Sequence, residues 1–153
     1  MPALAIDVSI FFDYFIKVKE KEERHRIARE FLNKISTQEI VVNEPFIFEV
    51  ELKAVLVRYL RKNIVENIVG KLLEYIIIIE EIRLREHANN IALETGCRAI
   101  DAYYIATAKT TNAILITNDR IMKQNAMKTS IKTFHLIEEY QKVLKLIDFE
   151  TIS

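Results

Sequence analysis

The order of apolar and polar positions along this chain predicts helices and strands that alternate. Apolar residues that recur every three or four positions indicate amphipathic helices, and short β-branched runs indicate strands. We expect strands at Ala3–Val8, Glu39–Val42, Ile76–Ile79, Ala113–Ile116 and Lys132–Leu136. An apolar segment, Ile10–Val18, follows the first strand, and we expect helices at Lys19–Ile35, Pro45–Arg61, Asn63–Tyr75, Ile82–Thr95, Ala99–Lys109, Arg120–Met127 and Ile137–Ile147.

This alternation predicts an α/β fold, in which a parallel sheet with right-handed crossovers carries helices on both faces. Local signals support some of the element ends. Asn43-Glu44-Pro45 is expected to open a helix with proline in its first turn, and Gly96 suits a helix C-terminal cap. Asp119 is a candidate N-cap for the helix that follows it.

Length and composition predict one domain that spans residues 1–153. A chain of 153 residues buries about 70% of the surface that its unfolded form exposes. Half of the residues are hydrophobic, and glycine and proline number two each, so a globular chain without flexible linkers is expected. The 22 basic and 22 acidic residues give no net charge, so any attraction to nucleic acid has to be local.

The single cysteine, Cys97, excludes an internal disulfide and a multi-cysteine zinc site. The first residues lack the basic start and long apolar stretch of a signal peptide. No apolar run approaches the roughly 18 residues that a membrane span needs. We therefore expect a cytoplasmic protein with no membrane association.

Three aspartates occupy positions where α/β proteins carry out chemistry. Asp7 ends the first strand, Asp101 lies in the first turn of its helix, and Asp119 follows the strand Ala113–Ile116. Ligands of open parallel sheets bind beyond the carboxyl ends of the strands. Taken alone, Asp7 also fits a turn or a helix cap, Asp119 fits an N-cap, and Asp101 fits a charge that interacts with the helix dipole.

One glutamate of the helix Pro45–Arg61 is a further candidate. Glu51 has Ile47, Phe48, Ala54 and Val55 as neighbours at helical spacing, which places it on the expected apolar side. A carboxylate there needs a partner. Glu49 has Lys53 four residues on, a surface pair that explains it without function. We prefer Glu51 as the site residue, with Glu49 as the alternative.

The stretch from Gly96 to Met122 resembles the core of PIN-domain ribonucleases. It contains Asp-Ala-x-Tyr-x-Ala, then a strand, then Thr-x-Asp. The resemblance extends from residue 3 to about residue 136. It implies a PIN-like three-layer α/β/α fold with a central parallel sheet of four to five strands. In this family the acids stand where this chain has Asp7, Glu51, Asp101 and Asp119.

The resemblance implies a VapC-like metal-dependent endoribonuclease, with RNA as its substrate, an antitoxin as partner and a homodimeric state. Clustered carboxylates repel one another, and a cation relieves this; oxygen ligands favour Mg²⁺ or Mn²⁺. Asp7, Asp101 and Asp119 are then expected as metal ligands, and Glu51 as a ligand or an orienter of the attacking water. The remaining candidates lie near the metal or the substrate: Ser9, Thr117, Asn118, Arg98 and Arg120. The two arginines fit phosphate contacts and solvated surface charges equally well.

Two alternatives stay open. The first is a phospho-acceptor signalling domain, which also binds Mg²⁺ on a doubly wound sheet. Such a domain carries adjacent acids after its first strand, where this chain has only Asp7. It also needs a lysine at the end of its last strand, and Lys132 lies near that place. A non-catalytic PIN-like module that binds RNA or protein is the second. A glycine-rich nucleotide loop is excluded, because the only glycines are Gly70 and Gly96.

Overall fold

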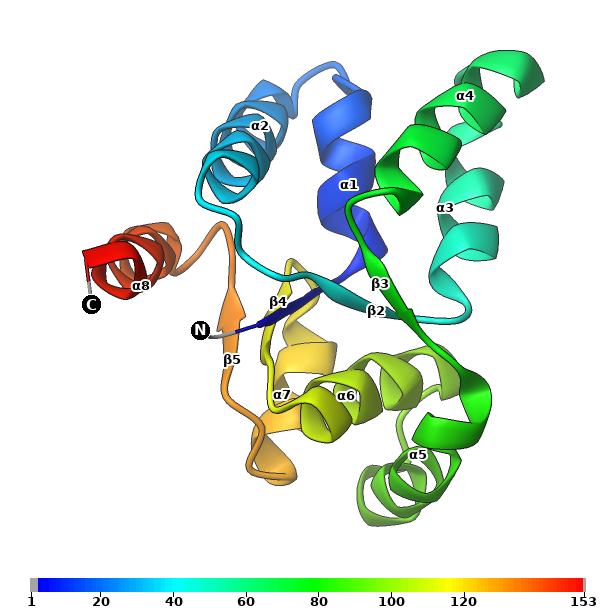
Figure 1. The fold of residues 1–153 in the computed structure, drawn as a ribbon, viewed down its shortest axis with the longest axis vertical. Helices are drawn as coiled ribbons and strands as arrows, with labels where there is room; N and C mark the ends of the chain where they lie inside the picture. Colours follow the sequence, from blue (N-terminus) through cyan, green and yellow to red (C-terminus); the bar gives the residue numbers. More distant parts are fainter. Residues whose placement is uncertain (1–2, 153) are drawn as a thin grey trace.

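Five strands and eight helices alternate along residues 3–152, the part of the chain that the computed structural model describes (Figure 1). The strands are β1 (Leu4–Ile6), β2 (Asn43–Pro45), β3 (Ile77–Ile79), β4 (Ile114–Thr117) and β5 (Thr133–His135). The helices are α1 (Val8–Phe15), α2 (Glu22–Thr37), α3 (Phe48–Leu56), α4 (Lys62–Leu73), α5 (Glu81–Thr95), α6 (Ala99–Thr111), α7 (Arg120–Lys128) and α8 (Tyr140–Ile152).

All strand pairs in the sheet are parallel. Strand β4 lies between β1 and β5, and β2 pairs with β3. A single parallel bridge between Leu4 and Val42 joins the two ladders. The strands therefore follow the order β3-β2-β1-β4-β5, as expected for a central parallel sheet of four to five strands.

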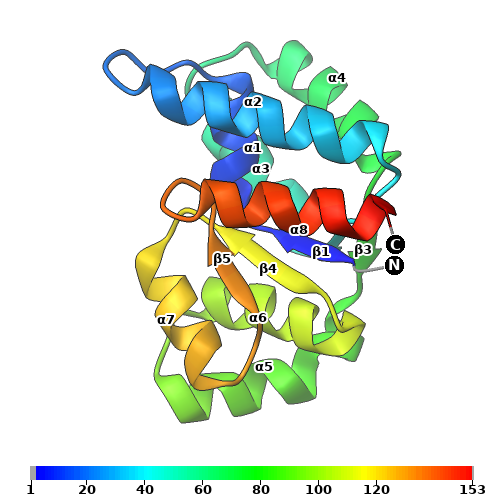
Figure 2. The ribbon, with the colours of Figure 1, turned by 90° about the vertical axis from the view of Figure 1, so that its left-hand side faces the viewer.

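Helices cover both faces of this sheet and complete three layers (Figure 2). Helices α1 to α4 and α8 lie on one side, and α5, α6 and α7 lie on the other. Helix α6 packs directly under the sheet, and its Tyr104, Ile105 and Ala106 are fully buried. The predicted α/β/α fold is thus confirmed.

The structure corrects the second strand and the start of the helix after it. The strand is Asn43–Pro45, because these residues pair with Ile77–Ile79 of β3. Glu39–Val42 contributes only the bridge at Val42. Proline has no N–H to donate, but the ladder continues through Phe46, whose N–H donates to Ile79 O at 3.1 Å. Helix α3 therefore begins at Phe48 and not at the proline.

Two predicted helix ends agree with the structure. Gly96 follows α5 in the left-handed conformation, with φ of 67°, where a side chain would be strained. Asp119 caps α7, because its Oδ1 accepts from the N–H groups of Ile121 and Met122 at 2.8 and 3.1 Å. Helix α8 begins at Tyr140, three residues later than expected. Across residues 3–152, no helix combines the length and apolar character of a membrane span.

Candidate active site

Asp7 sits at the carboxyl end of β1 and is held by two hydroxyls. Ser9 Oγ and Thr117 Oγ1 donate to Asp7 Oδ2 at 2.9 and 3.0 Å. Asp7 also precedes α1, but its side chain makes no capping bond to the described backbone of that helix. The residue is 7% exposed. The carboxylate is therefore fixed by the first turn of α1, through Ser9, and by β4, through Thr117.

Asp101 and Asp119 are joined through one guanidinium. Arg98 Nε and Nη2 donate to the two oxygens of Asp101 at 3.3 and 3.1 Å, and Nη2 also donates to Asp119 Oδ2 at 3.3 Å. Arg98 precedes α6, so Asp101 in the first turn lies within its reach. Asp119 thus uses one oxygen for its cap and turns the other toward the site. Arg98 supplies the positive charge between two of the predicted carboxylates.

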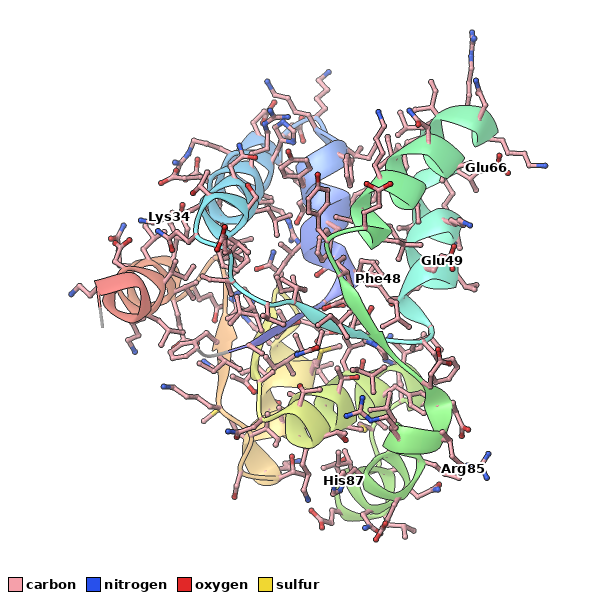
Figure 3. All side chains as sticks on the ribbon, in the orientation of Figure 1. Lys34, Phe48, Glu49, Glu66, Arg85 and His87 are labelled. Atoms are coloured by element: carbon pink, nitrogen blue, oxygen red, sulfur yellow. The ribbon has the colours of Figure 1, made fainter. Side chains whose placement is uncertain are left out.

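Glu51 reaches the site from α3, whereas Glu49 does not. Tyr104 on α6 donates its hydroxyl to Glu51 Oε1 at 2.7 Å. Glu49 instead pairs with Lys53 at 3.0 Å on the surface, and Figure 3 shows it on the outer side of α3. The preference for Glu51 over Glu49 as the glutamate facing the site therefore agrees with the geometry.

The face of α3 that enters the core differs from the expected one. Phe48, Leu52 and Leu56 are fully buried, while Ala54 is exposed and Ile47 is half-buried. Phe48 packs edge-on against Phe11 of α1, with ring centroids 5.1 Å apart. Because this stripe is rotated, Glu51 lies at its border and not at its centre. A border position leaves the carboxylate open to a cavity.

That cavity has a volume of about 920 Å³ and lies at the carboxyl edge of the sheet. The predicted site residues that line it are Asp7, Ser9, Glu51, Arg98, Asn118, Asp119 and Arg120. Asp101 and Thr117 are 0% exposed and contact this lining through Arg98 and Asp7. Arg120 forms an ion pair with Glu138, and Asn118 Oδ1 accepts from Ile137 N–H at 3.2 Å. The structure therefore gathers all nine residues in one region.

The electrostatics of this region favour the addition of positive charge. Burial raises the pKa of Asp7 above its ordinary value, and the charge of Asp119 raises it further. The hydrogen bonds from Ser9 and Thr117 lower this pKa, but by less than burial raises it. Burial also raises the pKa of Glu51, and the charges of Asp7 and Asp101 add to this increase. The hydrogen bond from Tyr104 lowers the pKa of Glu51. Each carboxylate makes ionisation of the others less favourable.

Two residues that sequence reasoning missed adjoin this cluster. Glu44 is fully buried, and its Oε1 accepts from Ile6 N–H at 2.6 Å, in place of a further ladder bond between β1 and β2. Its Oε2 has no partner among the described atoms, and burial raises its pKa well above the ordinary value. Tyr104 is the tyrosine of the Asp-Ala-x-Tyr-x-Ala motif, but the sequence assigned it no role in the site. Its place three residues after Asp101, on the same helix face, is the signal that could have identified it.

The donor atoms fit a hard divalent cation, although the side chains do not form a finished coordination group. Carboxylate oxygens from β1, α3 and the start of α7 face the same cavity, which suits Mg²⁺ or Mn²⁺. Among the described residues, no three His, Cys, Asp or Glu side chains are grouped closely enough to hold a metal ion. Arg98 instead balances Asp101 and Asp119. The fit thus rests on donor chemistry.

One feature of a phospho-acceptor domain is missing at this site. Lys132 is exposed and lies over the ring of Phe134, with Nζ 5.9 Å from its centroid. It is not among the described residues that line the cavity. Lys132 therefore does not share the cavity that Asp7 lines.

The sequence profile of the PIN domain matches residues 4–128. No curated protein matches the chain in sequence. Several solved structures share its fold, among them the following three. VapBC-1 from nontypeable Haemophilus influenzae has 16% identity and a TM-score of 0.63, and the match covers 86% of this chain and 96% of that one. FitAcB from Neisseria gonorrhoeae has 17% identity, a TM-score of 0.61 and the same two coverages. A toxin–antitoxin complex from Klebsiella pneumoniae has 22% identity and a TM-score of 0.57, with coverages of 76% and 86%.

Proposed function

The chain belongs to the PIN-domain family, and we propose that it is a metal-dependent endoribonuclease that acts as the toxin of a toxin–antitoxin pair. PIN-domain toxins are generally nucleases, and PIN domains generally use divalent metals. One observation carries the proposal for this chain: Asp7, Glu51 and Asp119 face a single cavity from three different elements, with Asp101 buried beside them.

Mg²⁺ or Mn²⁺ held by Asp7, Asp101, Asp119 and Glu51 would make a bound water more acidic and neutralise charge on a phosphodiester. The protein's own groups prepare this site. Ser9 and Thr117 restrict the orientation of Asp7 through their hydrogen bonds to Oδ2. Tyr104 on α6 restricts Glu51 in the same way.

Glu51 is proposed to orient the attacking water and to take its proton. Tyr104 holds one oxygen of Glu51, and Glu51 lines the same cavity as Asp7 and Asp119, which suits this role. Arg98 is proposed to leave Asp101 and Asp119 and to contact the phosphate. Its side chain is 71% exposed, so it can turn without disturbing the core. No side-chain nucleophile is required in this scheme.

The partners follow from the fold and remain proposals. The similar structure from Klebsiella pneumoniae is described as a toxin–antitoxin complex. We propose an antitoxin protein as partner, a homodimeric state and a cytoplasmic location for this chain. The substrate is proposed to be RNA.

A cleavage assay with mixed cellular RNA tests the function. We expect endonucleolytic products with Mn²⁺ or Mg²⁺ and none after chelation, because the four carboxylates then lack a cation. Mapping the ends of the products identifies the cleaved sequence. Undiminished cleavage after thorough chelation would refute the metal dependence.

A further inference from the structure

One wall of the cavity is formed by the turn that follows α3. Val55, Arg58 and Tyr59 line the cavity that also contains Asp7 and Glu51. The turn is well fixed, because Tyr59 N–H and Leu60 N–H both donate to Leu56 O, at 3.0 and 2.9 Å. Leu56 itself is fully buried. Arg58 and Tyr59 are therefore exposed side chains on a rigid support.

Tyr59 offers an aromatic surface beside the carboxylates. Its ring packs edge-on against Phe12 of α1, with centroids 5.2 Å apart and an interplanar angle of 64°. The residue is still 58% exposed. Phe12 thus supports the ring from within while part of it remains open to the cavity. Exposed aromatic rings next to a basic group are the surface on which unpaired bases stack.

Arg58 is the rim arginine that is free to bind an anion. Among the described residues, four arginines line the cavity. Arg24 pairs with Asp13 at 3.1 Å, Arg98 with Asp101 and Asp119, and Arg120 with Glu138. Arg58 has no carboxylate partner within the part of the chain that the structure describes. Its charge is therefore available to a phosphate group.

The position of this pair relative to Glu51 suits a nucleotide next to the cleaved bond. Arg58 stands seven residues after Glu51, in the turn that follows the end of α3 at Leu56. Both side chains reach the same cavity. A strand bound with its phosphodiester at the carboxylates therefore passes Arg58 and Tyr59 with an adjoining nucleotide.

We propose that Arg58 and Tyr59 form a nucleotide-binding wall that selects unpaired RNA. Tyr59 stacks on the face of a base, and Arg58 binds a phosphate of the same strand. A duplex hides its base faces within the helical stack, so it gains nothing from Tyr59. This inference deepens the proposed nuclease function and rests on it.

The test measures binding and not turnover. A fluorescent single-stranded oligoribonucleotide of mixed sequence and an RNA duplex are titrated in Mg²⁺ with the whole 153-residue chain carrying Asp101→Asn, a substitution that we expect to prevent cleavage. In this background Tyr59→Ala is expected to weaken single-strand binding about 5- to 100-fold. Tyr59→Phe keeps the ring and should stay within about twofold of the parent. Duplex affinity should change little in either variant.

Tyr75→Ala is the matched control for Tyr59. Tyr75 is 80% exposed and does not line the described cavity. Its loss removes an equal ring elsewhere on the surface and should leave both affinities unchanged. Thermal unfolding of each variant checks that the fold is retained.

Salt dependence tests Arg58 separately. For single strands, each phosphate contact contributes about 0.7 to the slope of log K against log salt concentration. Arg58→Ala should therefore lower the magnitude of the slope by about 0.7. Arg61→Ala removes the same charge from an exposed residue that is not in the described cavity lining, and it should leave the slope unchanged.

The outcomes separate this inference from the function on which it rests. If Tyr59→Ala binds single strands as tightly as Tyr75→Ala while wild-type protein cleaves RNA, the proposed nucleotide-binding wall is refuted and the proposed nuclease function is retained. If wild-type protein neither binds nor cleaves RNA, both proposals fail. An equal loss of duplex and single-strand binding would also overturn the selection of unpaired RNA.

Discussion

Replacing Arg98 by glutamine should make the protein bind Mn²⁺ more tightly. The guanidinium of Arg98 lies between Asp101 and Asp119, at 3.1 and 3.3 Å from their oxygens. A cation that binds these carboxylates has to displace it. Arg98→Gln removes this competitor and leaves all four carboxylates in place.

The size of the effect follows from the burial of the groups. The Arg98 side chain is 71% exposed and that of Asp119 is 30% exposed, so this link contributes less than about 1 kcal/mol. The Asp101 side chain is 1% exposed and accepts two bonds, which adds about 1 kcal/mol. A competing interaction of about 1–2 kcal/mol corresponds to about 5- to 30-fold tighter Mn²⁺ binding in Arg98→Gln.

Titration calorimetry and thermal unfolding measure the two sides of this prediction. Without metal, Arg98→Gln should unfold at a lower temperature than wild type, because buried Asp101 loses its partner. With Mn²⁺ the variant should gain more stability than wild type, as tighter binding to the folded state requires. Arg120→Gln is the control, since Arg120 lines the same cavity but pairs with Glu138. Unchanged or weaker Mn²⁺ binding in Arg98→Gln would refute the reasoning.

Two further variants test neighbouring parts of the site. Glu51→Gln should reduce the initial rate of cleavage by orders of magnitude, because Glu51 faces the site. Glu49→Gln should leave this rate almost unchanged, because it removes only a surface pair with Lys53. Equal, mild effects of the two substitutions would show that α3 provides no catalytic carboxylate. Glu44→Gln should stabilise the protein increasingly as pH rises above about 4.5, the ordinary pKa of glutamate. Burial raises the pKa of Glu44 in the folded state, so wild-type stability is lost as pH rises from the unfolded-state pKa toward the folded-state pKa. Glutamine keeps the acceptor for Ile6 N–H and does not titrate. A stability difference between the two proteins that is independent of pH, in denaturant unfolding, would show that Glu44 is ionised.

The elements with strong local signals could be predicted from the sequence. The apolar run at β4, the αL glycine Gly96 and the capping aspartate Asp119 each specify their structure within a few residues. Strand β2 could not be predicted in this way. Asn43-Glu44-Pro45 has poor strand propensity, and it becomes a strand because Ile77–Ile79 is available to pair with it.

The side-chain contacts of the site depend on distant parts of the chain. The sequence places Asp7 at a strand end, but its bond to Thr117 joins two strands that are far apart in the sequence. In the same way, no signal in the neighbouring sequence shows whether the Arg98 side chain contacts Asp101 and Asp119 or only solvent. The face of α3 was misjudged because apolar residues occur on several sides of it, and packing against Phe11 decides which of them enter the core.

The central claim is that four carboxylates form the active site of a metal-dependent endoribonuclease. Cleavage of the same RNA in Mn²⁺ by wild type and by Asp101→Asn tests it most directly, with thermal unfolding measured on both proteins. The substitution keeps the size of the side chain and removes its charge. The account predicts that the variant stays folded and no longer cleaves. A folded Asp101→Asn that cleaves at the wild-type rate would contradict it.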